Sequence, residues 1–275
     1  MFEFDGIGTH WWLECLEAEF DEAAKKTILA EVERFDRAYS RFRDDSLIGQ
    51  LNRTGVLLHP PRELLEMFAW SQELHEVSDG AFDISVGGVL HEQGYGLRAQ
   101  AASIVEDFWQ HTTHNEREIR LPPGATIDNG GYGKGWLIDN LVKLLRLCGY
   151  QSFIVNGGGD MYVNAPKPVE IALEHPYDST KSIGVTRLQD QALAVSGTTK
   201  RTWQHAGKTY HHIVDPRTSD SLANDVAGVY VQAPTATIAD SLATILMIRP
   251  DLQADLSKKY SANVRIITNA QLEGS

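Results

Sequence analysis

Cysteine is scarce in this sequence, and long apolar stretches are missing from it. The 275 residues include two cysteines, Cys15 and Cys148, and no C-x-x-C pair, which argues against a zinc site or a redox dithiol. We expect both to be buried free thiols in a reducing compartment. No window approaches the ~18 apolar residues of a membrane span, so we expect no membrane insertion.

The first ten residues, MFEFDGIGTH, also lack the features of a secretory leader. They contain two acids, no basic segment and no apolar core. Cys15 lies inside a strand-like pattern instead of a lipoprotein signal. We therefore expect a cytoplasmic protein, although an exported protein whose leader had been removed would look the same.

Basic residues are the minority among the charged side chains. Lysine and arginine number 25 against 37 acids, which gives a formal charge of -12. Such an acidic surface argues against nucleic acid or an anionic membrane as the main partner. It still allows a local basic pocket for a phosphorylated ligand.

The pattern of apolar residues predicts an α+β fold with mainly antiparallel sheets and flanking helices. Helical spacing is found over 19–42, 62–79, 136–148 and 236–248, and Thr235 is a favourable N-cap for the last of these helices. Strand patterns are found over 7–17, 152–165, 169–176, 183–197, 212–215 and 226–234, and 105–131 has a loop-and-strand pattern. Short turns join several of the strands, which favours antiparallel pairing. We expect one large domain over 1–275, or two intimately packed subdomains, with no clear internal boundary.

The stretch TIDNGGYGKGWLIDNLVKLL contains four glycines around Lys134, between a short strand and a helix. Glycines let backbone amides approach a ligand closely, and a helix N-terminus attracts a phosphate. Asp128, just before the glycines, can accept a hydrogen bond from a ligand. The spacing matches neither the Rossmann nor the P-loop pattern. A phosphate-binding loop and a simple tight turn both remain open.

Two further stretches carry polar residues beside turns. In IVNGGGDMYV, the three glycines before Asp160 either line a ligand or form a hairpin turn. In YHHIVDPRT, His211 and His212 precede a strand and point to opposite sides, so at most one of them faces a site. That histidine is either a structural residue or a general base.

Asp240 and Thr244 lie four residues apart on an apolar helix, and so share one face of it. A buried carboxylate needs a partner. Mg²⁺ would supply one, with a carboxylate, a hydroxyl, a backbone carbonyl and phosphate or water oxygens around the ion. An Asp and a Thr four residues apart also occur by chance in many helices, where they have only a structural role.

In their order along the chain, these stretches resemble the motifs of the FAD:protein FMN transferase family, also called ApbE. The resemblance runs from about Ile7 to Leu246. The matching segments are IGTHWW, YSRFRDDSLIGQLN, DGAFDISVGGVLHEQGYG, IDNGGYGKGWLIDNL, FIVNGGGDMYV, VSGTTKR, and HHIVDPRT followed by APTATIADSLATIL.

This resemblance implies an activity. Members of the family cleave the pyrophosphate of FAD and attach FMN through a phosphoester to a Thr or Ser of a target flavoprotein, with Mg²⁺ and with release of AMP. Two other functions stay open on the residues alone: an FAD pyrophosphatase that gives FMN and AMP, and a non-catalytic FAD-binding protein.

The resemblance also implies roles for individual residues. His212 matches the proposed general base. The implied magnesium ligands are Asp240, Thr244 and the backbone carbonyl of Gly131. The implied FAD contacts are Ile7, Phe42, Ala81, Phe82, Asp83, Asp128, Lys134 and Ile213.

Several positions depart from the family pattern. Phe42 lacks the hydroxyl of the commoner tyrosine. Gly88 replaces the usual proline, Asn129 replaces the usual aliphatic residue, and HEQGYG and TSDS differ from the usual segments. None of these departures falls on an implied magnesium ligand.

Overall fold

A computed structural model gives the fold and describes residues 1–95, 105–197, 202–205, 207–211, 213–218 and 224–273. The chain divides into two compact units. Unit 1 comprises Met1–Phe35, Gly130–Thr199 and Asn224–Ser275, and unit 2 comprises Asp36–Asn129 and Lys200–Ala223. The single domain expected from the sequence stays a prediction.

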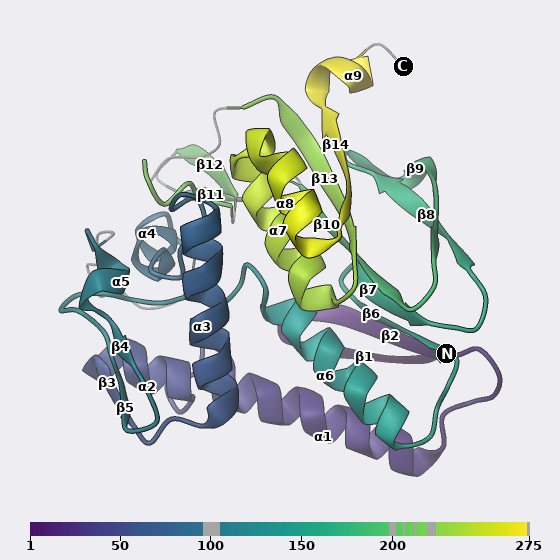
Figure 1. The fold of residues 1–275 in the computed structure, drawn as a ribbon, viewed down its shortest axis with the longest axis horizontal. Coiled ribbons are helices and arrows are strands. Elements are labelled where there is room, and N and C mark those ends of the chain that lie inside the picture. Colours follow the sequence, from purple (N-terminus) through teal and green to yellow (C-terminus); the bar gives the residue numbers. More distant parts are fainter. Residues whose placement is uncertain (96–104, 198–201, 206, 212, 219–223, 274–275) are drawn as a thin grey trace. The chain divides into compact units, whose positions relative to one another are not determined.

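The elements alternate irregularly along the chain (Figure 1). The helices are α1 (Glu22–Tyr39), α2 (Leu47–Thr54), α3 (Arg62–Val77), α4 (Gly87–Glu92), α5 (Phe108–His111), α6 (Gly133–Leu147), α7 (Ala236–Ile248), the 3-10 helix η1 (Pro250–Leu252), α8 (Gln253–Tyr260) and α9 (Asn269–Glu273). The strands are β1 (Phe2–Gly6), β2 (Thr9–Cys15), β3 (Val56–Leu58), β4 (Thr113–His114), β5 (Glu118–Arg120), β6 (Phe153–Gly157), β7 (Asp160–Asn164), β8 (Val169–His175), β9 (Asp178–Leu188), β10 (Gln191–Gly197), β11 (Thr202–His205), β12 (Lys208–His211), β13 (Val226–Ala233) and β14 (Asn263–Thr268).

Unit 1 is built on a seven-stranded sheet in the order β1-β2-β6-β7-β10-β13-β14. Every neighbouring pair in it is antiparallel. The turn between β6 and β7 has Gly158 at φ 67° and Gly159 at φ 100°, so glycine serves here to form a hairpin. One core cluster of this unit contains Ile154, Met161, Val163, Ala165, Leu173, Leu188, Leu193, Ala227, Tyr230 and Ile267.

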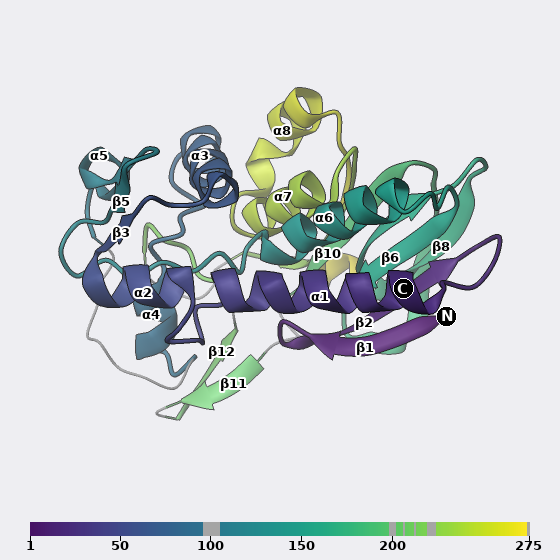
Figure 2. The ribbon, with the colours of Figure 1, turned by 90° about the horizontal axis from the view of Figure 1, so that it is seen from below.

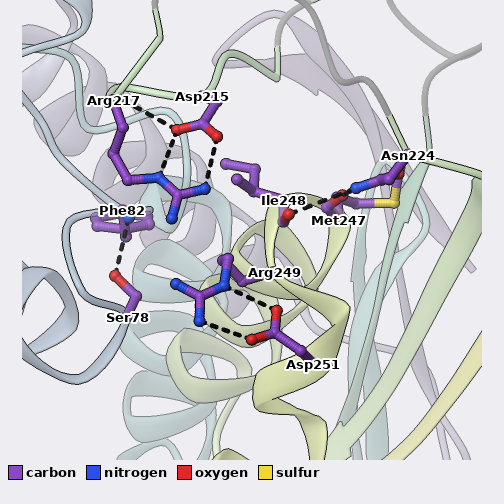
Figure 3. A network of polar contacts seen from close by, with 9 residues as sticks. All are labelled: Ser78, Phe82, Asp215, Arg217, Asn224, Met247, Ile248, Arg249 and Asp251. Carbon is purple, nitrogen blue, oxygen red and sulfur yellow. Dashed lines mark hydrogen bonds and ion pairs between the residues drawn. The ribbon is translucent and has the colours of Figure 1, made fainter.

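Helices α6 and α7 lie side by side over this sheet (Figure 1). Asp139 of α6 caps the start of α7, because its carboxylate accepts hydrogen bonds from the amides of Ala236 and Thr237 at 2.8 and 2.9 Å. Thr235 is the N-cap and accepts from the Ile238 amide, as the sequence predicts. The polar contacts of Asn224 with the last carbonyls of α7 hold its other end (Figure 3).

Unit 2 contains helices α2 to α5, the small sheet β3-β5-β4 and the hairpin β11-β12. The hairpin is seen in Figure 2 as two paired arrows. Asn52 holds the backbone of Ile127 from both sides: its amide donates to the Ile127 carbonyl at 2.9 Å, and its oxygen accepts from the Ile127 amide at 2.8 Å. This clamp fixes the strand-like segment that leads to Asp128.

The predicted α+β class with mainly antiparallel sheets is confirmed. The strand predicted over 7–17 is wrong at its start, since Ile7 and Gly8 form the two-residue turn of the β1-β2 hairpin, with φ 41° and 74°. The strand predicted over 212–215 lies earlier, at Lys208–His211, and residue 212 itself is outside the described residues.

The expectation of two buried thiols is also wrong. Cys148 is exposed because it is the C-cap residue of α6, and Cys15 is half-buried. Within the described residues, no helix combines the length and apolar character needed to cross a membrane.

Candidate functional site

Helix α6 starts at Gly133, three residues before the predicted Trp136, so that Lys134 and Gly135 belong to its first turn. Gly135 is required by close packing against α7. A Cβ at this position would lie 2.3 Å from the Ala236 carbonyl oxygen and 2.9 Å from the Asp240 Cβ. The missing side chain therefore lets α6 approach the helix that carries Asp240.

Asp240 is 3% exposed on α7 and is held by groups of α6. Its carboxylate accepts hydrogen bonds from the Gly135 amide at 3.0 Å and from Lys134 Nζ at 3.1 and 3.3 Å. Burial raises the pKa of Asp240, while Lys134 opposes this shift. The buried carboxylate is therefore matched by specific donors, as its position demands.

Thr244, one turn further along α7, donates its hydroxyl to the Gly131 carbonyl at 3.2 Å. The structure thus brings together two of the three oxygen groups predicted as magnesium ligands. Asp240, the third, lies four residues before Thr244 on the same helix.

The sequence left the role of Asp160 undecided. In the structure, Asp160 lies beside Lys134, the residue that also contacts Asp240. It begins β7, is 2% exposed, and places Oδ2 2.6 Å from Lys134 Nζ. Its other oxygen accepts from the Val195 amide at 3.0 Å. Sequence analysis could not assign this role, because the pairing depends on how β7 meets α6.

The donor set fits a hard divalent cation. Among the described residues, no group of three or more His, Cys, Asp or Glu side chains forms a metal cluster. The predicted set does not need one, since it uses one carboxylate, one hydroxyl and one carbonyl. Oxygen donors of these kinds are what Mg²⁺ prefers, with phosphate or water oxygens completing its shell.

In unit 2, Asp128 is anchored on both its backbone and its side chain. Its amide donates to the Ile84 carbonyl at 2.7 Å, and its carboxylate pairs with Arg41 at 2.8 Å. Both side chains of this ion pair are about nine-tenths buried, at 11% and 10% exposed. Asp128 therefore has a defined position, held by Arg41 and by the Asn52 clamp on Ile127.

Phe42 is 61% exposed and forms one side of an aromatic group in unit 2. The Arg41 guanidinium lies 4.4 Å from its ring centre, and Tyr95 meets it edge-on at 5.8 Å. Tyr95 in turn stacks on Trp203 of β11 at 4.8 Å. The sequence identified only Phe42, because Tyr95 and Trp203 come from distant segments without a shared motif.

The predicted contacts Ala81, Phe82 and Asp83 follow the end of α3 and are all buried. Asp83 pairs with His75 of α3 at 2.9 Å, and this contact raises the pKa of the imidazole. The Phe82 amide donates to Ser78 Oγ at 2.9 Å (Figure 3). The loop is thus tied back to the helix that precedes it.

The segment around the predicted base is described only in part. His212 lies outside the described residues, and His211 ends β12 with its backbone paired to Thr202. Ile213 is buried. The Asp215 carboxylate is held by the Arg217 guanidinium at 2.9 and 2.7 Å (Figure 3), which makes it a poor choice as a base.

Ile7 has an unusual backbone conformation. A β-branched residue at φ 41° is strained, and such strain gathers at functional sites. The two-residue turn between β1 and β2 accounts for this conformation, and the FAD contact that the resemblance implies for Ile7 stays a prediction.

Comparison with known proteins decides the family. Residues 7–266 match the model of the ApbE family.

The chain belongs to the ApbE family.

Several ApbE relatives cover nearly the whole chain. The protein named FAD:protein FMN transferase from Escherichia coli K12 is 24% identical over 95% of this chain and 82% of its own length. The protein of the same name from Vibrio cholerae is 25% identical over 82% of this chain and 74% of its own.

Solved ApbE structures share the fold. The ApbE protein from Thermotoga maritima superposes with a TM-score of 0.85 at 22% identity, covering 98% of this chain and 94% of the other. The flavin transferase ApbE from Vibrio cholerae gives 0.81 at 22% identity, covering 97% and 92%.

In this ApbE chain, two residues that lie close to predicted FAD contacts carry buried polar atoms without a hydrogen-bond partner in the described part of the chain. They are Ser85 Oγ, in a residue 2% exposed, and both amide atoms of Asn129, 7% exposed. Ser85 follows Asp83 by two positions, and Asn129 directly follows Asp128. Both aspartates are predicted FAD contacts. An unpaired buried amide is costly, so these atoms are candidates for contacts with a ligand.

Proposed function

We propose that this ApbE chain transfers FMN from FAD to a Thr or Ser hydroxyl of a target flavoprotein, with Mg²⁺, and releases AMP. The observation that carries the proposal is the meeting of Thr244 with the Gly131 carbonyl at 3.2 Å, beside the buried Asp240. The name FAD:protein FMN transferase, which these relatives carry, supports the transfer of FMN from FAD to a protein.

Three groups of unit 1 would hold the magnesium ion: the Asp240 carboxylate, the Thr244 hydroxyl and the Gly131 carbonyl. When bound, Mg²⁺ draws charge from the phosphoryl oxygens of the pyrophosphate. Lys134 places an ammonium in the first turn of α6, at the helix end whose dipole favours a phosphate. These residues would orient the pyrophosphate and stabilise the charge that develops on it.

Eight residues are proposed to contact FAD. They are Ile7, Phe42, Ala81, Phe82, Asp83, Asp128, Lys134 and Ile213. Among the proposed contacts in unit 2, Phe42 is best suited to this role, because its exposed aromatic ring can stack on a flavin or adenine ring.

The proposed reaction balances without a further reactant. The acceptor hydroxyl oxygen bonds to the phosphorus on the FMN side, the bond from that phosphorus to the bridging oxygen breaks, and AMP leaves with the bridging oxygen. The hydroxyl proton passes to a base, which we assign to His212. A general base contributes typically ~10²–10⁴-fold.

One incubation tests the proposal. The protein is mixed with FAD and Mg²⁺, with and without a purified flavoprotein domain that carries an acceptor Thr, and both AMP and covalent flavin are measured. Covalent flavin on the domain, with AMP in equal amount, supports the transferase. AMP without the domain would instead identify an FAD pyrophosphatase, and unchanged FAD would identify a binding protein.

A further inference from the structure

Lys134 forms a buried triad with Asp160 and Asp240 inside unit 1. Its ammonium lies 2.6 Å from Asp160 Oδ2 and donates to Asp240 Oδ1 and Oδ2 at 3.1 and 3.3 Å. The two carboxylate side chains are 3% and 4% exposed, and that of Lys134 is 22% exposed. One internal cation is therefore shared between two carboxylates from different elements.

The charges of the triad do not cancel. Two carboxylates and one ammonium leave a net negative charge in a buried place, where Coulomb interactions are strong. A divalent cation at Asp240 would reverse that sign and would also meet the ammonium that already contacts the same carboxylate. The two cations therefore cannot both hold Asp240 in the present arrangement.

The two contacts of the ammonium differ in length. The contact with Asp160 is the shorter one, and Asp160 is itself fixed by the Val195 amide at 3.0 Å. Asp240, in turn, keeps a donor of its own in the Gly135 amide at 3.0 Å. Lys134 can therefore leave Asp240 without losing Asp160, and Asp240 stays in place when Lys134 leaves.

We propose that Lys134 is a built-in competitor of the divalent cation for Asp240, and that Asp160 is the positioning residue that retains the ammonium when the cation takes Asp240. The inference rests on the proposed metal site at Asp240. It assigns Asp160 a role that neither the motif nor the metal ligands require. It also explains why a carboxylate stands in a strand whose five residues are all buried.

The test measures binding of Mn²⁺ alone to FAD-free protein, by electron paramagnetic resonance of the free ion. Removing the competing charge in Lys134→Met should tighten Mn²⁺ binding by at least about tenfold, because an ammonium touching the carboxylate opposes the metal strongly in a buried site. If Lys134 instead only supports the fold of the site, the same substitution weakens binding. Lys143→Met, an exposed change on the same helix with the same change in net charge, should leave the affinity within about twofold.

Asp160→Asn should act in the opposite direction. The ammonium is then left with Asp240 as its carboxylate partner in the triad, so Mn²⁺ binding should weaken several-fold. A double-mutant cycle separates positioning from plain charge. If Asp160 acts through Lys134, Asp160→Asn should change the Mn²⁺ affinity much less in the Lys134→Met background than in the wild type. Equal effects in both backgrounds would overturn the positioning role.

The double variant also keeps the test valid if Lys134→Met alone fails to fold. Lys134→Met/Asp160→Asn leaves one buried carboxylate, Asp240, with its Gly135 donor, and should bind Mn²⁺ much more tightly than Asp160→Asn. If these two variants bind Mn²⁺ with equal affinity, the proposed competition is refuted. Asp240→Asn separates this failure from failure of the proposed function: if it leaves Mn²⁺ binding unchanged, the metal site itself is wrong.

Discussion

The hydroxyl of Thr244 donates to the backbone carbonyl of Gly131, 113 positions away in the chain, at 3.2 Å. Each of these oxygens was predicted as a magnesium ligand from a different motif. Their contact shows that α7 and the glycine loop before α6 meet at these groups.

Thr244→Val keeps the volume of the side chain and removes its oxygen. We expect Mg²⁺-dependent flavin transfer to fall at least about 100-fold, since charge stabilisation by a metal ion is worth several kcal/mol. FAD binding, measured by flavin fluorescence, should change little. Ser241→Ala on the same helix removes a hydroxyl that donates one turn back to the Thr237 carbonyl, and serves as the control. Equal losses in both variants would show that the effect is on α7 in general.

Gly135→Ala should separate α6 from α7. Its Cβ would lie 2.3 Å from the Ala236 carbonyl oxygen, and such overpacking commonly costs about 1–3 kcal/mol. We expect a lower denaturation midpoint together with weaker Mn²⁺ binding, because the Asp240 carboxylate accepts a hydrogen bond from the Gly135 amide. Gly133→Ala is the matched control: a Cβ there meets nothing within 4 Å. Full stability of Gly135→Ala would contradict the described packing.

The His75–Asp83 pair predicts a pH-dependent contribution to stability. Contact with Asp83 raises the pKa of His75 above its ordinary 6.5. The charged imidazole is favoured in the folded state, so its contribution is full below the unfolded pKa and is lost as pH rises through the folded pKa. The stability difference between wild type and His75→Asn should therefore be larger near pH ~5.5 than near pH ~8.5. A difference that grows with pH would contradict the pairing.

Asn129→Leu should make the protein more stable and a weaker FAD binder. Removing a buried amide that has no partner in the described residues should raise the free energy of unfolding by ~1–3 kcal/mol. The amide would be lost as a ligand contact, so the dissociation constant for FAD should rise.

Asn164 supplies the matched control for this substitution. It is also 7% exposed, but its amide bonds to Arg146 and to the Gln151 carbonyl. Asn164→Leu should therefore destabilise the protein. If Asn129→Leu were equally destabilising, Asn129 would have a structural partner, and its assignment as a ligand contact would fail.

Local patterns allowed part of this structure to be predicted. The helix at 236–248 and its cap Thr235 follow from continuous apolar spacing and one favourable N-cap residue. The β6-β7 hairpin follows from glycines that can adopt positive φ. Helix α2 was missed, because its eight residues show too few turns for a period to be recognised.

Contacts between distant segments could not be predicted in the same way. The triad joins Lys134, Asp160 and Asp240 across more than 100 positions, and no local period encodes that meeting. Ile7 was placed in a strand because its neighbours alternate, although a two-residue turn interrupts that alternation. His75 was read only as part of an amphipathic helix, since nothing in its surroundings points to Asp83.

The central claim is that this chain moves FMN onto a protein hydroxyl, and the intact mass of the acceptor tests it most directly. The acceptor domain is incubated with the protein, FAD and Mg²⁺, and its mass is then measured. We predict the added mass of one FMN on the wild-type acceptor, with none on an acceptor whose Thr is changed to Val and none with Asp240→Asn protein. An unmodified acceptor beside released AMP would contradict the claim, as would equal modification by the Asp240→Asn variant.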